Sequence, residues 1–259
     1  MTNLNHQHKY TKMKEVGAIV GFILSSLKKE IKPGISGDDL EKIALRLMKE
    51  KKIKSSIFNY KGFPRNCCIS LNHVITHGIP NQKPFKEGDI VSVDIACHKK
   101  DKIGISYHAD AAFTMVVGKP TSEQTKLLNI TKNALNSAIY AIRPGVTTNH
   151  EIGKIIKEQV EKNPGFFVIK EFGGHDIGEK MHLSFFIPNS PLENPTKESV
   201  IIMPNTAICI EPLVQTVNAK IKISPEDGWA VLAENEKQQS AHFEDTIWIG
   251  EEGVEILTK

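Results

Sequence analysis

The chain has 259 residues, which is enough for one large domain or two small ones with a sizeable buried core. Apolar residues make up 40% of the sequence and charged residues 24%, which are ordinary values for a soluble globular protein. The formal net charge of +3 is too small to indicate a nucleic-acid or membrane partner. Residues 1–15 contain no apolar segment typical of a signal peptide, and the four cysteines form no Cys-x-x-Cys pair. These features predict a protein of a reducing cytosol.

Two helices are predicted at the start of the chain. Apolar residues recur at helical spacing between Met13 and Lys29, and Pro33-Gly34 ends this pattern. Ser36 is a suitable cap for a second helix that continues to about Lys51. Residues 1–11 precede the helical pattern, and we expect them to form a flexible tail.

Strands and two further helices are predicted after the second helix. Strand-like runs occur at Cys68–Leu71, Ile90–Ala96, Ala112–Val117, Gly165–Lys170, Ala207–Val214 and Thr246–Ile249. Between the third and fourth of these runs, Thr121 and Thr148 begin helices that end near Ile142 and Lys162. Two helices followed by strands therefore occur twice, which indicates two related halves within a single α+β domain of residues 1–259. We expect a mainly antiparallel sheet with helices packed on one face.

Four acidic residues lie in apolar surroundings that disfavour an isolated charge. Asp94 lies inside a predicted strand, where a carboxylate is costly unless it is paired or bound to a metal. Asp110, Glu211 and Glu244 border similar apolar runs, and His175 is flanked by glycines. Any one of these residues could cap a turn or pair with a lysine. Together they would repel one another unless cations neutralised them. Oxygen ligands with one imidazole suit Mn²⁺, Fe²⁺, Co²⁺ or Zn²⁺, and two such ions favour hydrolytic chemistry.

The order and spacing of these motifs resemble those of the type I methionine aminopeptidases. The resemblance covers Met13 to Ile249 and rests on HGIP at His77–Pro80, the strand-borne Asp94, HAD at His108–Asp110, GH-x-IG from Gly174, IEP from Ile210 and SA-x-x-E from Ser240. It implies the pita-bread fold, in which two pseudo-symmetric halves surround a curved antiparallel sheet with helices on its outer face. It also implies removal of the initiator methionine from nascent polypeptides, with a preference for a small second residue.

The resemblance assigns roles to particular residues of this chain. The implied ligands of two divalent ions (Co, Mn, Fe or Zn) are Asp94, Asp110, His175, Glu211 and Glu244, of which Asp110 and Glu244 bridge the ions. His77 would contact the scissile-bond region, His182 the substrate carbonyl, and Glu211 would also carry a proton. The implied methionine pocket consists of Tyr60, Phe63, Cys68 and Trp229. The histidines interpreted as structural or solvated are His73, His98, His108, His150 and His242.

Several positions depart from the family pattern. Asp94 and Asp110 are farther apart than usual, so we expect a longer hairpin loop around His98–Ser106 with the strand register kept on either side. Asp176 replaces the usual glycine after the metal-binding histidine, which indicates either a left-handed backbone or an altered metal affinity. Ala111 replaces a threonine, so a hydroxyl near the second ligand should be absent. Lys61 replaces a histidine near the pocket.

Two other functions fit parts of the pattern. X-Pro aminopeptidases and prolidases share the five-ligand set, but they usually carry a large additional N-terminal domain. A non-catalytic binding module that acts on ribosomes or nucleic acid typically lacks metal ligands, whereas all five are present here. We therefore predict a cytoplasmic, monomeric metalloaminopeptidase whose partners are the N-termini of nascent chains. The lysines of Lys49–Lys54 could help it to dock near the ribosome, although a solvated helix end is the simpler interpretation.

Overall fold

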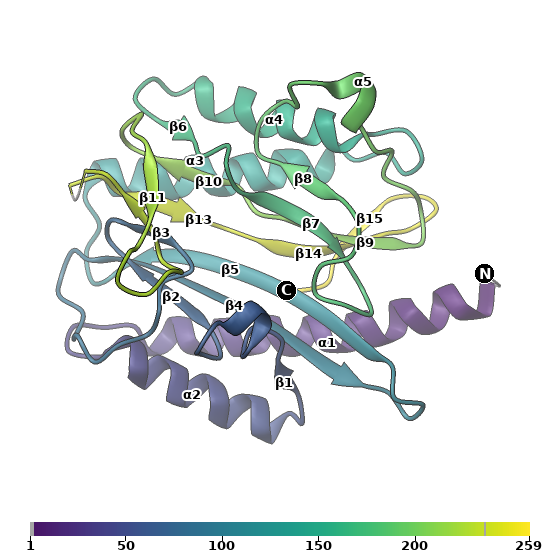
Figure 1. Ribbon diagram of the computed structural model, residues 1–259, viewed down its shortest axis with the longest axis horizontal. Helices are drawn as coiled ribbons and strands as arrows, with labels where there is room; N and C mark the ends of the chain where they lie inside the picture. Colours follow the sequence, from purple (N-terminus) through teal and green to yellow (C-terminus); the bar gives the residue numbers. More distant parts are fainter. Residues whose placement is uncertain (1–2, 236) are drawn as a thin grey trace.

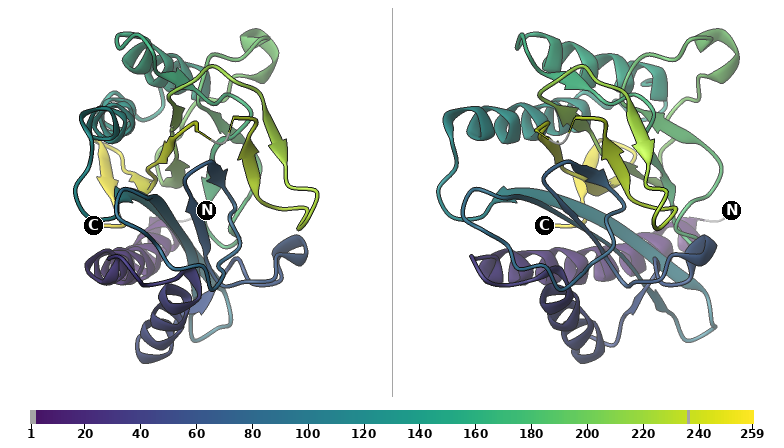
Figure 2. Two further views of the ribbon diagram at one scale, coloured as in Figure 1. Left: turned by 90° about the vertical axis from the view of Figure 1, so that its left-hand side faces the viewer. Right: turned by 60° about the vertical axis from the view of Figure 1, so that its left-hand side comes forward.

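The computed structural model describes residues 3–235 and 237–259. Helices α1 (Asn3–Glu30) and α2 (Gly37–Glu50) lie along the lower side of Figure 1, and α3 (Ser122–Tyr140) and α4 (Asn149–Glu161) along the upper side, with strands between. Figure 2 shows these four helices gathered toward one side of the strands. Every pairing between the described strands is antiparallel. The predicted α+β class is confirmed.

Local sequence signals fix the starts of three of these helices. Ser36, Thr121 and Thr148 each accept a hydrogen bond from the backbone N–H three residues later, and the residue there bonds back to the cap in each case. Such capping boxes satisfy backbone donors that a helix leaves unpaired at its first turn. The caps predicted at these three positions are confirmed.

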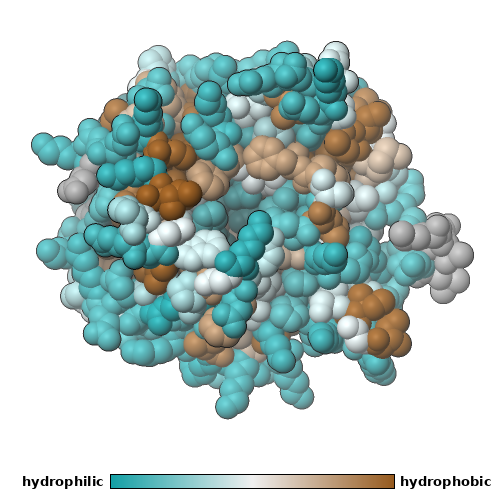
Figure 3. Space-filling view, viewed as in Figure 1, coloured by the Kyte–Doolittle hydropathy of each residue, from teal (hydrophilic) through white to brown (hydrophobic). Residues whose placement is uncertain are grey.

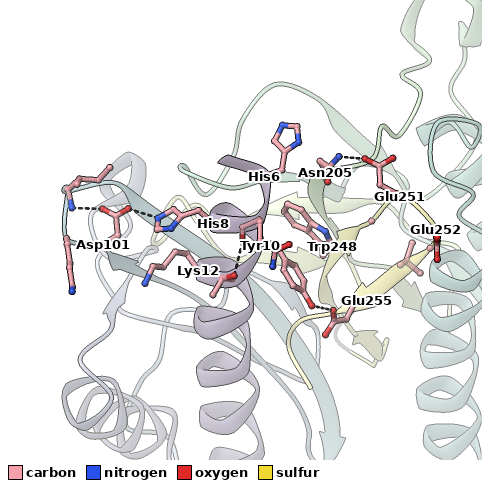
Figure 4. A pocket seen from close by; sticks show the side chains of 17 residues that line it. His6, His8, Tyr10, Lys12, Asp101, Asn205, Trp248, Glu251, Glu252 and Glu255 are labelled. Carbon is pink, nitrogen blue, oxygen red and sulfur yellow. Dashed lines mark hydrogen bonds and ion pairs between the residues drawn. The ribbon is translucent and has the colours of Figure 1, made fainter. Parts of the chain in front are cut away.

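The flexible tail predicted for residues 1–11 is wrong from Asn3 onward, because these residues form the first turns of α1. Met1 and Thr2 lie outside the described residues. Figure 4 shows what holds this segment: His8 Nε2 lies 3.2 Å from Asp101 Oδ2, and the Tyr10 hydroxyl donates to Glu255. The Tyr10 ring also packs against Trp248, with 5.4 Å between the ring centroids. The partners in these contacts lie far away in the sequence. The spacing of apolar residues within residues 1–11 therefore could not indicate that this segment is held as a helix.

Strands of the two halves form two larger sheets. In the first half, β4 (Ile90–Lys100) pairs with β5 (Ser106–Val116), β2 (Cys68–Leu71) and β1 (Lys54–Ser55). In the second half, the strand order is β15 (Val254–Ile256), β14 (Asp245–Ile249), β9 (Thr206–Ile210), β7 (Gly173–Ile177) and β8 (Phe186–Pro188). The two main apolar clusters lie beneath α1 and α2 and beneath α3 and α4, and each includes residues of both halves, such as Trp248 in the first and Ile90 in the second.

Smaller elements complete the chain. One small sheet contains β13 (Ser240–His242), β10 (Leu213–Gln215) and β6 (Phe167–Val168), and another contains β11 (Ile221–Ile223), β12 (Val231–Ala233) and β3 (Val74–Thr76). The remaining helical turns are η1 (Tyr60–Gly62) and α5 (Pro195–Glu198). The strand predicted at Gly165–Lys170 is therefore reduced to β6. The strand predicted at Ala207–Val214 is divided at Glu211-Pro212, because proline cannot donate a ladder hydrogen bond.

The extra residues between Asp94 and Asp110 lengthen the strands rather than the loop. Strand β4 continues to Lys100 and β5 begins at Ser106, so only residues 101–105 form the turn. The register runs unbroken from Ile90 opposite Val116 to Lys100 opposite Ser106. The predicted long loop is wrong, since Cys97 and Tyr107 within this stretch are buried in the first core cluster. The expectation that the register is kept is confirmed.

All four cysteines are free and buried. Within the described ranges, none of the helices combines the length and hydropathy that crossing a membrane would require.

A close approach between α1 and the end of the chain yields the first prediction. A Cβ atom added at Gly21 would lie 2.4 Å from the carbonyl oxygen of Thr258, and one at Gly17 would lie 2.5 Å from that of Leu257. Helix propensity alone predicts that Gly21→Ala stabilises the protein by about 1 kcal/mol. We expect the opposite, a loss of about 1–3 kcal/mol, because the backbone of residues 257–259 must move.

Urea unfolding of the variant measures this change. The matched control is Ser25→Ala, an exposed position on the same helix, which should leave the free energy of unfolding unchanged or slightly higher. Equal behaviour of the two variants would contradict the packing argument.

Candidate metal centre

The structure brings all eleven predicted site residues to one cavity of about 260 Å³. They are Tyr60, Phe63, Cys68, His77, Asp94, Asp110, His175, His182, Glu211, Trp229 and Glu244. Figure 3 shows the molecule from the side of Figure 1, with a hollow near the centre of this face. A larger groove of about 1300 Å³ lies between the first turns of α1 and the β14–β15 hairpin, and its lining includes none of these residues (Figure 4).

The long β4–β5 ribbon places two of the acids side by side. Asp94 lies opposite Ala112, and Asp110 lies opposite Ala96, so the two aspartates are diagonal neighbours. Since residues at such positions share one face of the ribbon, both carboxylates point toward the same side. Ser92 and Thr114 continue this face, with their hydroxyl oxygens 2.7 Å apart.

Three further residues reach the cavity from the second half. His175 lies on β7, and Glu211 follows the last residue of β9, where Pro212 ends the strand. Glu244 precedes β14 and is bridged to β5: its N–H donates to the Ala112 carbonyl at 3.0 Å, and the Ala112 N–H donates back at 3.2 Å. The cavity therefore lies where the two halves meet.

Glu244 is the residue common to three groups of possible ligand atoms. The groups are Asp94 with Asp110 and Glu244, His175 with Cys209 and Glu244, and Glu211 with His242 and Glu244. Within each group the ligand atoms lie within 4.8 Å of one another. Donor atoms this close can share one ion or bridge two.

Burial makes these carboxylates hard to ionise. It raises the pKa of Glu211 to about 8, and burial together with the nearby Glu211 raises that of Asp110 to about 7. Burial and the neighbouring acids raise the pKa values of Asp94 and Glu244 well above their ordinary range. Among the described residues, histidines are the only basic side chains that lie within 4.0 Å of these acids. The cluster therefore lacks the positive charge that would stabilise its ionised form.

Unpaired buried oxygens indicate that a cation fits this cluster. Asp110 Oδ1 and Glu244 Oε1 are both buried without a hydrogen-bond partner in the part of the chain that the structure describes. A buried carboxylate oxygen in this state is costly, and a divalent ion would satisfy it. Carboxylates with one imidazole are the donors that Mn²⁺, Fe²⁺, Co²⁺ and Zn²⁺ accept.

His175 is held in a form suited to binding metal. Its Nδ1 lies 3.1 Å from the carbonyl oxygen of Asp176, to which the neutral ring donates in its Nδ1–H tautomer. Burial lowers the pKa of His175 to about 3, so the ring is neutral near pH 7. Its Nε2, 3.9 Å from Asp110 Oδ2, thus keeps a free lone pair.

Asp176 supports the loop that carries His182. Its backbone lies in β7 and does not have the positive φ expected for a glycine position. Its carboxylate accepts hydrogen bonds from the Ser184 N–H (2.7 Å), the Ser184 hydroxyl (2.8 Å) and the Phe185 N–H (3.0 Å). The predicted left-handed backbone is therefore wrong, whereas the altered metal affinity stays a prediction. The carboxylate is bonded to the loop after β7 and belongs to none of the groups of possible ligand atoms found among the described residues.

Two histidines border the acids. His182 Nδ1 lies 2.9 Å from the Tyr60 hydroxyl, and its ring lies 4.0 Å from that of His175, centroid to centroid. His77 has a left-handed backbone (φ 56°), a conformation that is strained for this residue type and is often found at functional sites. Burial lowers the pKa of His77 to about 4, so its ring is neutral as well.

An apolar pocket adjoins the acids. The rings of Phe63 and Trp229 meet edge to face, with their centroids 5.3 Å apart. Cys68 lies directly opposite Asp94 in the β2–β4 ladder, which places its thiol beside the acids. Ile57 and Met181 complete this lining. The sequence does not indicate these two residues, because an apolar residue in a loop carries no signal of its function.

Two other residues beside the acids were missed. His242, interpreted as structural or solvated, has its Nε2 3.4 Å from Glu211 Oε2. Thr246 is fully buried; its hydroxyl donates to the Asp110 carbonyl at 2.7 Å and accepts from the Asp110 N–H at 2.8 Å. Because residue 111 is alanine, the sequence predicts no hydroxyl near Asp110. That prediction is wrong, because Thr246 of β14 supplies a hydroxyl there.

Buried carboxylates without basic partners, next to a neutral imidazole, are typical of metal-dependent hydrolases. Comparison with known proteins agrees: the chain belongs to metallopeptidase family M24, whose model matches residues 11–251. A methionine aminopeptidase of Mycoplasma capricolum is 37% identical over 260 residues, which is 100% of this chain and 99% of the relative. Methionine aminopeptidase 1 of Bacillus subtilis is 36% identical over 95% of each chain.

The solved structures agree on the fold. A crystal structure of methionine aminopeptidase from Thermotoga maritima superposes with a TM-score of 0.89 at 33% sequence identity, covering 97% of each chain. The predicted pita-bread fold is therefore confirmed, and so is the prediction that the chain is a metallopeptidase.

The raised carboxyl pKa values predict how the metal-free protein responds to pH. Above pH 6.5 the unfolded chain has released its carboxyl protons, whereas folded Asp110 and Glu211, with pKa values of about 7 and 8, still hold theirs. Because the folded state binds more protons, its stability falls as pH rises from about 6.5 to 8. Histidines with lowered pKa values, such as His175, act in the opposite direction only below about pH 6.5.

Thermal melts in a chelating buffer between pH 6.5 and 8 test this trend. Glu211→Gln should flatten the decline, and Glu226→Gln, at an exposed position, should leave it unchanged. A melting temperature that rises with pH in this window would contradict the assigned direction.

Proposed function

We propose that the protein is a methionine aminopeptidase that removes the initiator methionine from nascent polypeptides by metal-dependent hydrolysis. One observation carries this proposal: five metal-ligand side chains and an apolar pocket line the same cavity. The hydrolytic centre and the side-chain pocket are thus adjacent, as required of an enzyme that cleaves after one N-terminal residue. The relatives described above support the same activity.

Two divalent ions, drawn from Mn²⁺, Fe²⁺, Co²⁺ and Zn²⁺, would be held by Asp94, Asp110, His175, Glu211 and Glu244. When bound, they supply a water of lowered pKa and polarise the scissile carbonyl. The resemblance to type I methionine aminopeptidases implies that Asp110 and Glu244 would bridge them. The unpaired oxygens of these two residues support this assignment.

Other side chains act on the substrate and its protons. Glu211, buried at the cavity, is suited to carry a proton from the attacking water to the leaving amine. His182 would donate to the substrate carbonyl oxygen from Nε2, since Tyr60 occupies its Nδ1. His77 would contact the scissile-bond region from the opposite loop.

The pocket favours a methionine side chain. Phe63 and Trp229 present ring edges and faces, and Cys68 and Met181 add polarisable sulfur. An unbranched thioether packs well against such a lining through dispersion and sulfur–aromatic contacts. This chemistry favours methionine removal over cleavage before proline. The presence of all five ligands disfavours a non-catalytic binding module.

Location and partners follow from this function. The protein would act in the cytoplasm as a monomer on the N-termini of nascent chains, with a preference for a small second residue. Lys49, Lys51, Lys52 and Lys54 are exposed where α2 ends, which would suit docking near the ribosome. A solvated helix end remains the simpler interpretation of these lysines.

Release of methionine from Met-Gly-Met-Met tests the reaction. Protein stripped of metal should be inactive, and addition of Mn²⁺ or Co²⁺ should restore release. His175→Ala and Glu244→Ala should abolish activity in folded protein, because each removes a ligand, whereas His73→Gln should retain it. Peptides of the Met-Gly-x, x-Pro and Leu-x types define the specificity. Cleavage of x-Pro peptides alone, or full activity of His175→Ala, would overturn the proposal.

Replacement of Phe63 tests the pocket separately. Truncation in a buried hydrophobic pocket costs about 1–3 kcal/mol of transition-state binding. We therefore expect Phe63→Ala to lower kcat/KM for Met-Gly-Met-Met by about 10–200-fold while metal affinity is retained. Phe58→Ala, in the same segment but outside the cavity lining, is the matched control. Equal activity of the two variants would remove Phe63 from the pocket.

A further inference from the structure

His242 is held firmly against the acid-bearing face of the β4–β5 ribbon. It is the last residue of β13 and lies opposite Leu213 of β10. Its backbone N–H donates to the Thr114 hydroxyl at 2.8 Å, and that hydroxyl donates to the His242 carbonyl at 2.8 Å. Thr114 shares a strand face with Asp110. The ring, 1% exposed, is therefore fixed beside the acids.

The Nε2 atom of His242 has no hydrogen-bond partner among residues 3–235 and 237–259. It is buried and lies 3.4 Å from Glu211 Oε2 and 3.9 Å from Glu244 Oε2. Both distances exceed the 2.7–3.2 Å usual for an N–H···O hydrogen bond. A buried polar atom left unsatisfied is destabilising, so its presence here calls for a ligand.

We propose that His242 Nε2 is a sixth protein donor of the metal centre and binds the same divalent ion as Glu211 and Glu244. This inference rests on the proposed metal centre and adds one residue to it. Ligand atoms about 2.1 Å from a common ion lie about 3.0–3.4 Å apart in octahedral or tetrahedral arrangements. The 3.4 Å separation from Glu211 meets this requirement, and the 3.9 Å separation from Glu244 requires a small side-chain shift.

A second imidazole changes which ions the centre prefers. With His175 alone the donor set is almost entirely oxygen, which suits Mn²⁺. With His242 included, the donor set contains two imidazole nitrogens, which belong to two different groups of possible ligand atoms. Such a set favours Zn²⁺, Co²⁺ or Fe²⁺. His242 is thus a residue that sets metal selectivity as well as affinity.

Proton NMR of the Co²⁺-loaded protein counts coordinated histidines without measuring activity. Each imidazole bound to Co²⁺ gives one strongly shifted, exchangeable ring N–H resonance. Two such resonances are expected in the unaltered protein, from His175 and His242. His242→Gln should lose one of them, and His73→Gln, a histidine outside the cavity lining, should keep both.

The outcomes separate this inference from the proposed function. One resonance in the unaltered protein, or two that persist in His242→Gln, would overturn the role of His242 while the metal centre stands. No shifted resonance and no Co²⁺ uptake would overturn the metal centre itself. The count in the unaltered protein decides the question even if the variant fails to fold. A weaker affinity of folded His242→Gln for Zn²⁺, by more than about 10-fold relative to His73→Gln, would support the proposal independently.

Discussion

Mutual repulsion among four carboxylates in one cavity is the constraint around which this fold is organised. Asp94, Asp110, Glu211 and Glu244 share a cavity in which no lysine or arginine of the described residues lies within 4.0 Å of them. Ionising them without a cation is costly, so the free energy of the centre depends on bound metal. The architecture must hold the acids together in spite of this repulsion. It does so by drawing them from both halves, which are joined by two apolar clusters that each contain residues of both halves.

Backbone hydrogen bonds between the halves keep the acids in place. Ala112 and Glu244 exchange a pair of N–H···O bonds, and the Thr246 hydroxyl both accepts from and donates to the backbone of Asp110. These bonds act on the main chain of the ligand residues and leave their carboxylates free. Pro212 has a related effect, because it ends β9 directly after Glu211 and releases that residue from the ladder. Regular strands thus position Asp94 and Asp110, whereas Glu211 and Glu244 reach the cavity from the ends of strands.

Part of this arrangement could be predicted from the sequence, because its signals are local. Capping boxes at Ser36, Thr121 and Thr148 mark helix starts within four residues, and a carboxylate inside an apolar strand marks Asp94. The lengthened hairpin and the helical start of α1 could not be predicted in this way. Both depend on distant contacts, such as Tyr107 in the first core cluster and Tyr10 against Glu255. His242 lies two residues before Glu244, which is a local signal of its place near the acids, but its contact with Glu211 also depends on the pairing of β13 with β10 and on Thr114.

The departures from the family pattern show how a site can keep its geometry while its neighbours change. Ala111 removes a side-chain hydroxyl, yet Thr246 holds the Asp110 backbone from another strand. Asp176 adds a carboxylate directly after the candidate ligand His175, but three hydrogen bonds from Ser184 and Phe185 occupy three of its about four acceptor sites. That carboxylate therefore competes little for metal and instead ties down the loop that presents His182 to Tyr60. A substitution beside a ligand residue can thus affect the position of the substrate instead of the binding of the ion. Which of these it affects depends on whether the new side chain forms its hydrogen bonds to a substrate-binding loop or points toward the ion.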